Sequence, residues 1–93
     1  MTLVARHLTI TGRVQGVFYR AWAVDTAREL GLAGWVRNRM SGAVEAVVQG
    51  EAAKVECFID AAWKGPPAAR VEHIDASASE LDETTDFDVR ATM

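Results

Sequence analysis

The chain has 93 residues, of which 49% are hydrophobic and 25% charged, the composition of one small soluble domain spanning residues 1–93. Its net charge of −3 excludes a general nucleic-acid binder, because such proteins need a basic surface. No apolar run approaches the ~20 residues of a membrane span. The N-terminus lacks the charged segment and apolar core of a signal peptide. We therefore expect a cytoplasmic protein without nucleic-acid or membrane partners.

The first five residues are expected to form a disordered or edge-associated arm. Apolar and polar side chains then alternate, which predicts a half-buried strand from about residue 6 to residue 14. After a loop, apolar and small residues recur at helical spacing. We expect this helix to end at Gly31, which stands where a left-handed C-cap belongs. The helix positions that carry the prediction are Ala23, Ala27 and Leu30.

Two strands follow, over residues 33–38 and 43–49, and residues 39–42 have the composition of a turn, so a hairpin is predicted. One side of the second of these strands is expected to face the helices, and its residues are Val44, Ala46 and Val48.

The second helix is predicted from a single apolar stripe that ends before Gly65 and two prolines. The stripe consists of Val55, Phe58, Ile59, Ala62 and Trp63. Cys57, the one cysteine, lies off this stripe, so we expect a partly exposed thiol without a role. The next strand, residues 71–78, breaks its alternation between 71 and 74, which indicates a bulge. A solvated acidic loop and a short strand at residues 87–89 complete the chain.

This order predicts an α+β fold of the ferredoxin-like β-α-β-β-α-β type, with a short extra C-terminal strand. The sheet should be rich in antiparallel pairs and carry both helices on one face. A right-handed crossover makes the first two strands parallel, so their C-terminal ends lie at the same edge. The loop after the first strand and Asn38, at the end of the second, should therefore converge.

The loop within residues 12–20 has the features of an anion-binding site. Gly16 allows the backbone to approach a ligand closely, and the N-terminus of a helix presents unpaired N–H groups. Arg20 adds a guanidinium that matches phosphate or carboxylate geometry. The alternative is an ordinary glycine-containing loop with a solvated Arg20. The Gly-Lys-Ser/Thr of a P-loop and the three glycines of a dinucleotide fingerprint are both absent.

Residues 12–20 (GRVQGVFYR) resemble the signature G-x-V-Q-G-V-x-[FY]-R of the acylphosphatase family. Residues 34–38 (GWVRN), followed by Gly42, resemble the family's second signature. The chain departs from the family at residues 39–41, where an Asp-Gly or Pro-Asp-Gly turn is usual, so the conformation of this turn stays open. The resemblance continues through residues 49–51, 65–67 and 87–90 and so covers essentially the whole chain.

The resemblance implies a hydrolase that splits the carboxyl–phosphate bond of acyl phosphates into a carboxylate and inorganic phosphate. Arg20 and Asn38 would be the catalytic residues, and Asn38 would orient the attacking water. No metal and no organic cofactor are implied, and we expect a monomer. The phosphoryl group would be held by Arg20 and by the backbone N–H groups of Gln15, Gly16, Val17, Phe18, Tyr19 and Arg20.

Alternatives remain for both the residues and the function. Asn38 borders a turn, where asparagine often caps its own backbone. An RNA-recognition module shares the element order, but it stacks bases on strand aromatics, and residues 43–48 contain none. A non-catalytic anion-binding or regulatory domain of the same fold is the more serious alternative. His7 and His73 are expected to have no metal-binding or general-base role. The tryptophans should be packing residues, with Trp35 on the uncovered sheet face.

Overall fold

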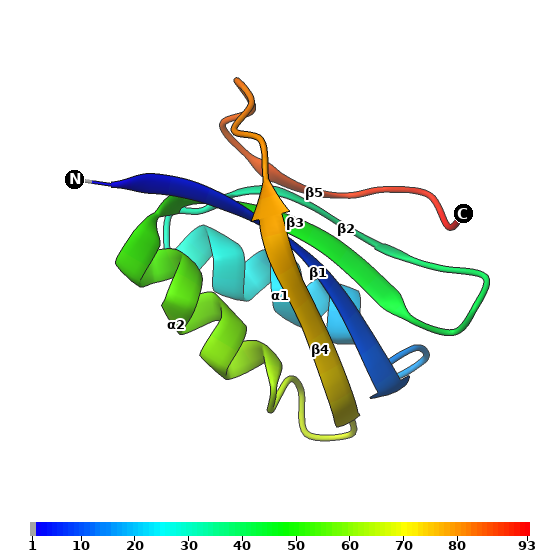
Figure 1. The fold of residues 1–93 in the computed structure, drawn as a ribbon. Coiled ribbons are helices and arrows are strands. Elements are labelled where there is room, and N and C mark those ends of the chain that lie inside the picture. The colour runs from blue at the N-terminus through cyan, green and yellow to red at the C-terminus, as the bar shows by residue number, and fades with distance from the viewer. Residues whose placement is uncertain (1) are drawn as a thin grey trace.

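The computed structural model describes residues 2–93, and its elements follow the predicted order (Figure 1). In chain order they are β1 (Leu3–Arg13), α1 (Tyr19–Glu29), β2 (Ala33–Asn38), β3 (Val44–Glu51), α2 (Ala52–Ala62), β4 (Arg70–Ser79) and β5 (Phe87–Val89).

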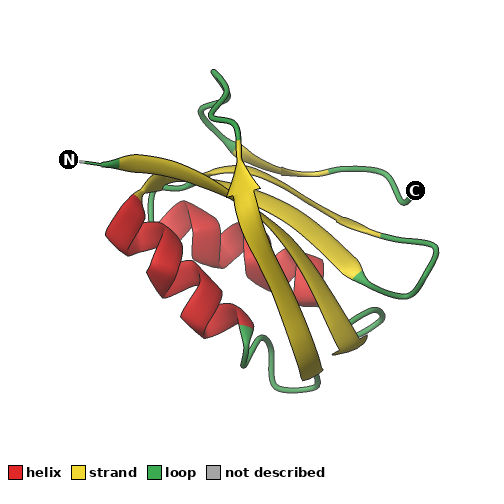
Figure 2. Ribbon diagram, in the orientation of Figure 1, coloured by secondary structure: helices red, strands yellow, loops and turns green. Residues whose placement is uncertain are grey.

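The strands form one sheet in the order β4-β1-β3-β2-β5, and both helices cover the same face (Figure 2). All pairs are antiparallel except β2 with β5. Because β1 and β2 each run antiparallel to β3, they are parallel to each other, as the crossover rule predicts. The ferredoxin-like α+β fold is thus confirmed, and the C-terminal ends of β1 and β2 lie at the same edge.

The core lies between the sheet and the two helices. Leu8 and Ile10 on β1 are fully buried, because alternate residues of a strand point to the same face. The helix-facing side of β3 is buried as predicted, at Val44, Ala46 and Val48. α1 and α2 cover these strands with Ala23, Ala27, Val55, Phe58 and Ala62.

The predicted end of α1 is confirmed. Gly31 has a φ of 70°, its N–H donates to the carbonyl of Arg28, and the N–H of Leu32 donates to the carbonyl of Ala27. This is the Schellman arrangement, which satisfies carbonyls that a helix end leaves unpaired. The expectation that Trp63 belongs to the buried stripe of α2 is wrong, because this residue is 46% exposed. Trp63 follows the last helical residue and meets His73 edge-on instead of entering the core.

The expected N-terminal arm is wrong for residues 3–5, which belong to β1 and pair with β3. The pairing forms because β3 continues to Glu51 and so offers partners along its whole length. Met1 lies outside the described residues.

The bulge predicted near residue 72 is confirmed, because Thr11 pairs with His73 whereas Gly12 pairs with Val71. A Cβ on Gly12 would come within 2.2 Å of a β4 carbonyl oxygen, so only glycine fits.

Candidate active site

A hollow of about 400 Å³ lies where β1 and β2 end. It contains both residues that the crossover argument brings together, Arg20 from the first turn of α1 and Asn38 from the end of β2. The full lining is Val14, Gly16, Phe18, Tyr19, Arg20, Ala21, Asn38 and Val89. Of the other residues expected to hold phosphate, Gln15 and Val17 do not line the hollow, and the Val17 side chain is buried.

The loop that enters α1 has an unusual backbone. Gly16 has a φ of 74°, and Phe18 has a φ of 65°, the one positive value at a non-glycine position within residues 2–93. Turns with left-handed residues can form nests of N–H groups that bind anions. No backbone N–H of residues 15–20 donates to another backbone group in the part of the chain that the structure describes. The loop therefore has free donors at the positive end of a helix.

Arg20 is the one charged side chain that lines the hollow. Within residues 2–93 its guanidinium takes part in no ion pair. The first turn of α1 has no acidic residue, so no carboxylate there competes for its N–H groups. The local charge is positive, although the chain as a whole is acidic. The hollow is therefore suited to an anion with several oxygens, such as a phosphoryl group.

Asn38 contributes an unusual atom, since its Oδ1 is buried and has no hydrogen-bond partner within the described residues. The following turn is closed by other groups: the N–H of Arg39 donates to the carbonyl of Ala43, and the N–H of Gly42 donates to that of Arg39. Asn38 therefore does not cap its turn, which was the alternative interpretation. Its amide oxygen is therefore an unpaired acceptor buried beneath the wall of the hollow, which Asn38 helps to line.

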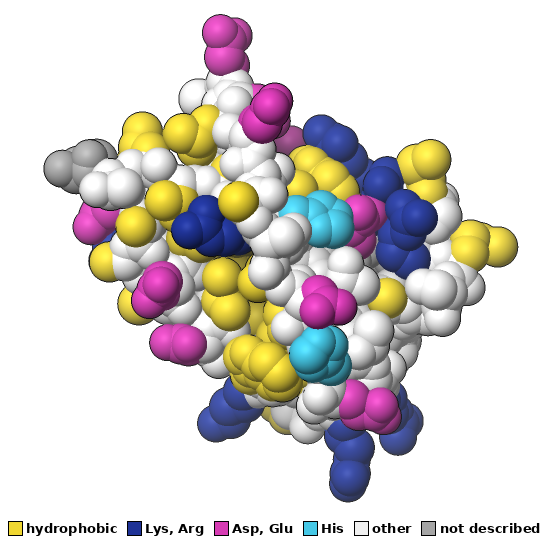
Figure 3. Space-filling view, viewed as in Figure 1, with side chains coloured by type: hydrophobic (Ala, Val, Ile, Leu, Met, Phe, Trp, Pro, Cys, Tyr) yellow, Lys and Arg dark blue, Asp and Glu magenta, His cyan; other side chains and the backbone are white. Residues whose placement is uncertain are grey.

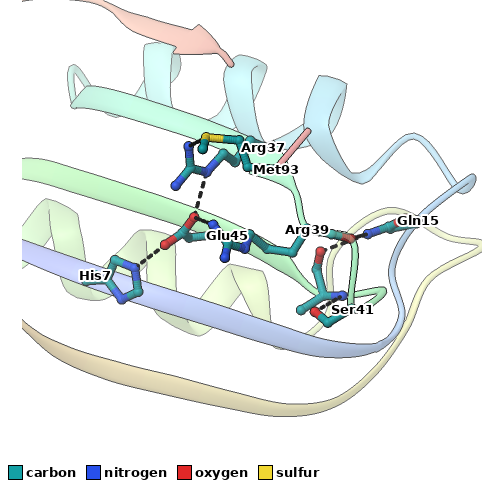
Figure 4. Close-up of polar contacts among 8 residues, drawn as sticks. His7, Gln15, Arg37, Arg39, Ser41, Glu45 and Met93 are labelled. Atoms are coloured by element: carbon teal, nitrogen blue, oxygen red, sulfur yellow. Dashed lines mark hydrogen bonds and ion pairs between the residues drawn. The ribbon is translucent and has the colours of Figure 1, made fainter. Parts of the chain in front are cut away.

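Gln15 has a role that sequence reasoning missed. Its Nε2 donates to the carbonyl oxygen of Arg39 at 2.8 Å and to that of Ala43 at 2.9 Å (Figure 4). These bonds tie the loop to the turn between β2 and β3, which begins immediately after Asn38. No side-chain pattern could reveal this contact, because both acceptors are backbone carbonyls distant in sequence.

Tyr19 fixes the other side of the loop. Its ring is buried, and its hydroxyl donates to the carbonyl of Ala62 at 2.7 Å, joining the start of α1 to the end of α2. Burial raises the pKa of the Tyr19 phenol above its ordinary value. The hydroxyl therefore stays protonated and acts as an anchor. Residues on both sides of Gly16 are thus held by contacts outside the hollow.

A charged cluster lies on the sheet face opposite the helices. Glu45 contacts His7 at 2.6 Å, Arg37 at 2.6 Å and Arg39 at 3.3 Å (Figure 4). Burial opposes ionisation of Glu45, but hydrogen bonds from His7 and Arg37 and the charge of Arg37 outweigh it, so the pKa of this carboxyl is lowered. The expected position of Trp35 on this face is confirmed, and the guanidinium groups of Arg37 and Arg90 each lie over its ring.

The histidine, cysteine and acidic side chains of residues 2–93 lie outside the hollow. Both histidines lie beside acidic side chains on the face shown in Figure 3, and neither lines the hollow. Within residues 2–93 there is no group of three or more His, Cys, Asp or Glu side chains arranged to hold a metal ion. Neither helix of the described chain is long and apolar enough to cross a membrane.

Comparisons with known proteins show which family the chain resembles. Residues 6–89 match the family model described as acylphosphatase. A protein named acylphosphatase from Acidovorax sp. (strain JS42) is 47% identical over 90 residues, which cover 97% of this chain and 93% of that protein. Its counterpart from Azoarcus sp. (strain BH72) is 53% identical over 91 residues, covering 98% and 93%.

Comparison of the fold with solved structures leads to the same family. The solved structure of an acylphosphatase from Coxiella burnetii has a TM-score of 0.91 and 38% identity, with coverage of 95% of this chain and 93% of that chain. The family model, the relatives and the structural neighbour agree over nearly the whole sequence. The chain belongs to the acylphosphatase family.

Proposed function

We propose that this acylphosphatase cleaves its substrate in the hollow between Arg20 and Asn38. The observation that supports the proposal is the combination of donors and acceptor there. Free N–H groups and one guanidinium suit a phosphoryl group, and the side-chain amide of Asn38, which has no protein partner at its oxygen within residues 2–93, is placed to contact a water molecule there. The substrate is a small acyl phosphate, and the products are a carboxylate and inorganic phosphate.

The backbone loop and Arg20 bind the phosphoryl oxygens. Phosphoryl transfer places negative charge on these oxygens, and fixed donors stabilise that charge without having to reorganise. The donors are rigid because the Gln15 side chain and the Tyr19 hydroxyl anchor the loop on two sides. Arg20 supplies the compensating positive charge, which the N–H groups supply only in part.

Asn38 orients the attacking water through its side-chain amide at the wall of the hollow. A neutral amide is a poor base, so the water proton passes to a phosphoryl oxygen of the substrate. The new bond joins the water oxygen to phosphorus, and the bond from phosphorus to the acyl oxygen breaks with its electron pair. The leaving carboxylate has a conjugate acid with a pKa of about 4, so it departs without a general acid. This scheme fits a lining without histidine, cysteine or carboxylate side chains.

The rival function is a non-catalytic anion-binding or regulatory domain of the same fold. It would use the loop and Arg20 in the same way but would have no use for the unpaired amide of Asn38.

We further propose that the protein acts as a cytoplasmic monomer. One chain supplies every residue invoked here, and a lone cysteine needs no oxidising compartment.

The test measures the release of phosphate from benzoyl phosphate, with and without a chelator, by the native protein and two arginine variants. Arg20→Gln should weaken competitive inhibition by phosphate and lower turnover together. Arg13→Gln is the matched control, because Arg13 is exposed at the end of β1 and does not line the hollow. A native protein that binds phosphate without hydrolysing benzoyl phosphate would support the regulatory alternative. Equal effects of both substitutions would exclude a specific role for Arg20.

A further inference from the structure

Part of the hollow has no use for a phosphoryl group. Beside the donors, it is lined by an apolar surface formed by Val14, Phe18, Ala21 and Val89. The volume of about 400 Å³ lies within the range of pockets that hold whole small molecules, roughly 300–1,000 Å³. The free N–H groups and Arg20 account for a phosphoryl group alone. The apolar surface is therefore available to the remainder of a bound substrate.

Phe18 is the most unusual residue of this surface. Its side chain is 82% exposed, so it contributes little to the core. Its backbone is left-handed, a conformation that bulky residues rarely adopt and that usually occurs where a function requires it. The left-handed backbone serves the N–H loop, but the exposed Phe18 ring has no comparable role in the packing of the fold. Its position at the hollow provides an apolar ring against which a ligand can pack.

Val89 supplies a second exposed apolar side chain from a different element. It ends β5, pairs with Val36 of β2 and is 50% exposed. Phe18 and Val89 therefore meet at the same hollow from segments far apart in the chain. No charged side chain other than Arg20 lines the hollow in residues 2–93, so nothing there pairs with a charged or strongly polar acyl group.

We propose that Phe18 and Val89 bind the acyl group and make the enzyme prefer acyl phosphates with apolar, aromatic acyl groups. The inference rests on the proposed function, because it requires the phosphoryl group at the loop. Apolar contacts of this kind change kcat/KM by roughly 10–200-fold in enclosed pockets. Because this surface is open to solvent, we expect the lower end of that range.

The experiment compares kcat/KM for benzoyl phosphate and acetyl phosphate, which share the phosphoryl group and differ in the acyl group. In Phe18→Asn the ratio should fall about tenfold relative to the native protein, and in Val89→Thr by a smaller factor. Asparagine tolerates the left-handed backbone, so the loop should keep its shape. Met40→Asn is the matched control, because Met40 is 85% exposed but does not line the hollow. Its ratio should equal the native one.

A binding measurement separates this inference from the proposed function. Phenylphosphonate should bind more tightly than methylphosphonate to the native protein, and the difference should shrink in Phe18→Asn and Val89→Thr. If neither acyl phosphate is hydrolysed but the phosphonates still differ, the proposed function fails and the apolar site stands. If the substrate ratio is unchanged in both variants, or the two phosphonates bind the native protein equally, the apolar site is wrong.

Discussion

Replacing Asn38 by alanine should separate catalysis from binding. Asn38 belongs to the lining of the hollow, and its Oδ1 is buried without a protein partner within residues 2–93. If it orients only the attacking water, the substitution removes a contact that forms as the reaction proceeds. Losing one such positioned polar group lowers kcat roughly 10²–10³-fold, equivalent to about 2.7–4 kcal/mol of barrier. KM and competitive inhibition by phosphate should change far less.

The same substitution should not destabilise the fold. A buried polar atom without a partner costs about 1–3 kcal/mol of folding free energy, and alanine removes that atom. The few contacts of the amide that are lost offset part of this gain. Each net 1 kcal/mol shifts Tm by about 4–8 °C in a domain of this size. We therefore expect the Tm of Asn38→Ala to equal or exceed that of the native protein.

The assay pairs steady-state hydrolysis of benzoyl phosphate with thermal unfolding followed by circular dichroism in phosphate-free buffer. Phosphate must be absent from the unfolding experiment because ligand binding raises Tm by itself. Ser41→Ala, on the following turn and outside the hollow, is the control and should retain native kcat. A folded Asn38→Ala protein with near-native kcat would refute the mechanism. A clear fall in its Tm would show that the amide oxygen has a structural partner after all.

The other predictions concern the groups that support the site. Gln15→Ala should lose two hydrogen bonds to the hairpin and so weaken phosphate binding. Gln15→Glu should bind phosphate as weakly, since a carboxylate cannot donate these hydrogen bonds, and calorimetry with phosphate checks both variants. Ionised Glu45 should stabilise the fold fully above the ordinary glutamate pKa of about 4.3 and lose this effect as pH falls through its lowered folded pKa. Denaturant titrations should therefore show a smaller loss of stability on acidification for Glu45→Gln than for the native protein. Tyr19→Phe should lower the free energy of unfolding by roughly 1–3 kcal/mol, because the carbonyl of Ala62 loses its buried donor, and urea denaturation measures this.

Much of the fold could be predicted because its signals are local. A period of two along β1 and β3 and a period near 3.6 along α2 specify which side chains face inward, and burial follows those periods. Gly31 ends α1 because a left-handed C-cap favours glycine. The handedness of the crossover then brings the ends of β1 and β2 to one edge. That is why the sequence could predict Arg20 and Asn38 in one site, while their catalytic roles stay predictions.

Other features depend on partners distant along the chain, and only the tertiary structure decides them. The Gln15 amide meets carbonyl oxygens of the hairpin, an interaction that leaves no trace in residue types. Residues 3–5 join the sheet because β3 is long enough to pair with them. Trp63, at the C-cap of α2, contacts His73 of β4 instead of the core. The left-handed backbone of Phe18 is a conformation that residue propensity argues against, so no local pattern predicts it. Sequence by itself determined the elements, their order and the edge that holds the site, because these follow from periodicity and chain handedness. Tertiary structure decided which polar atoms are satisfied and which stay free, because that depends on groups that meet only when the chain is folded.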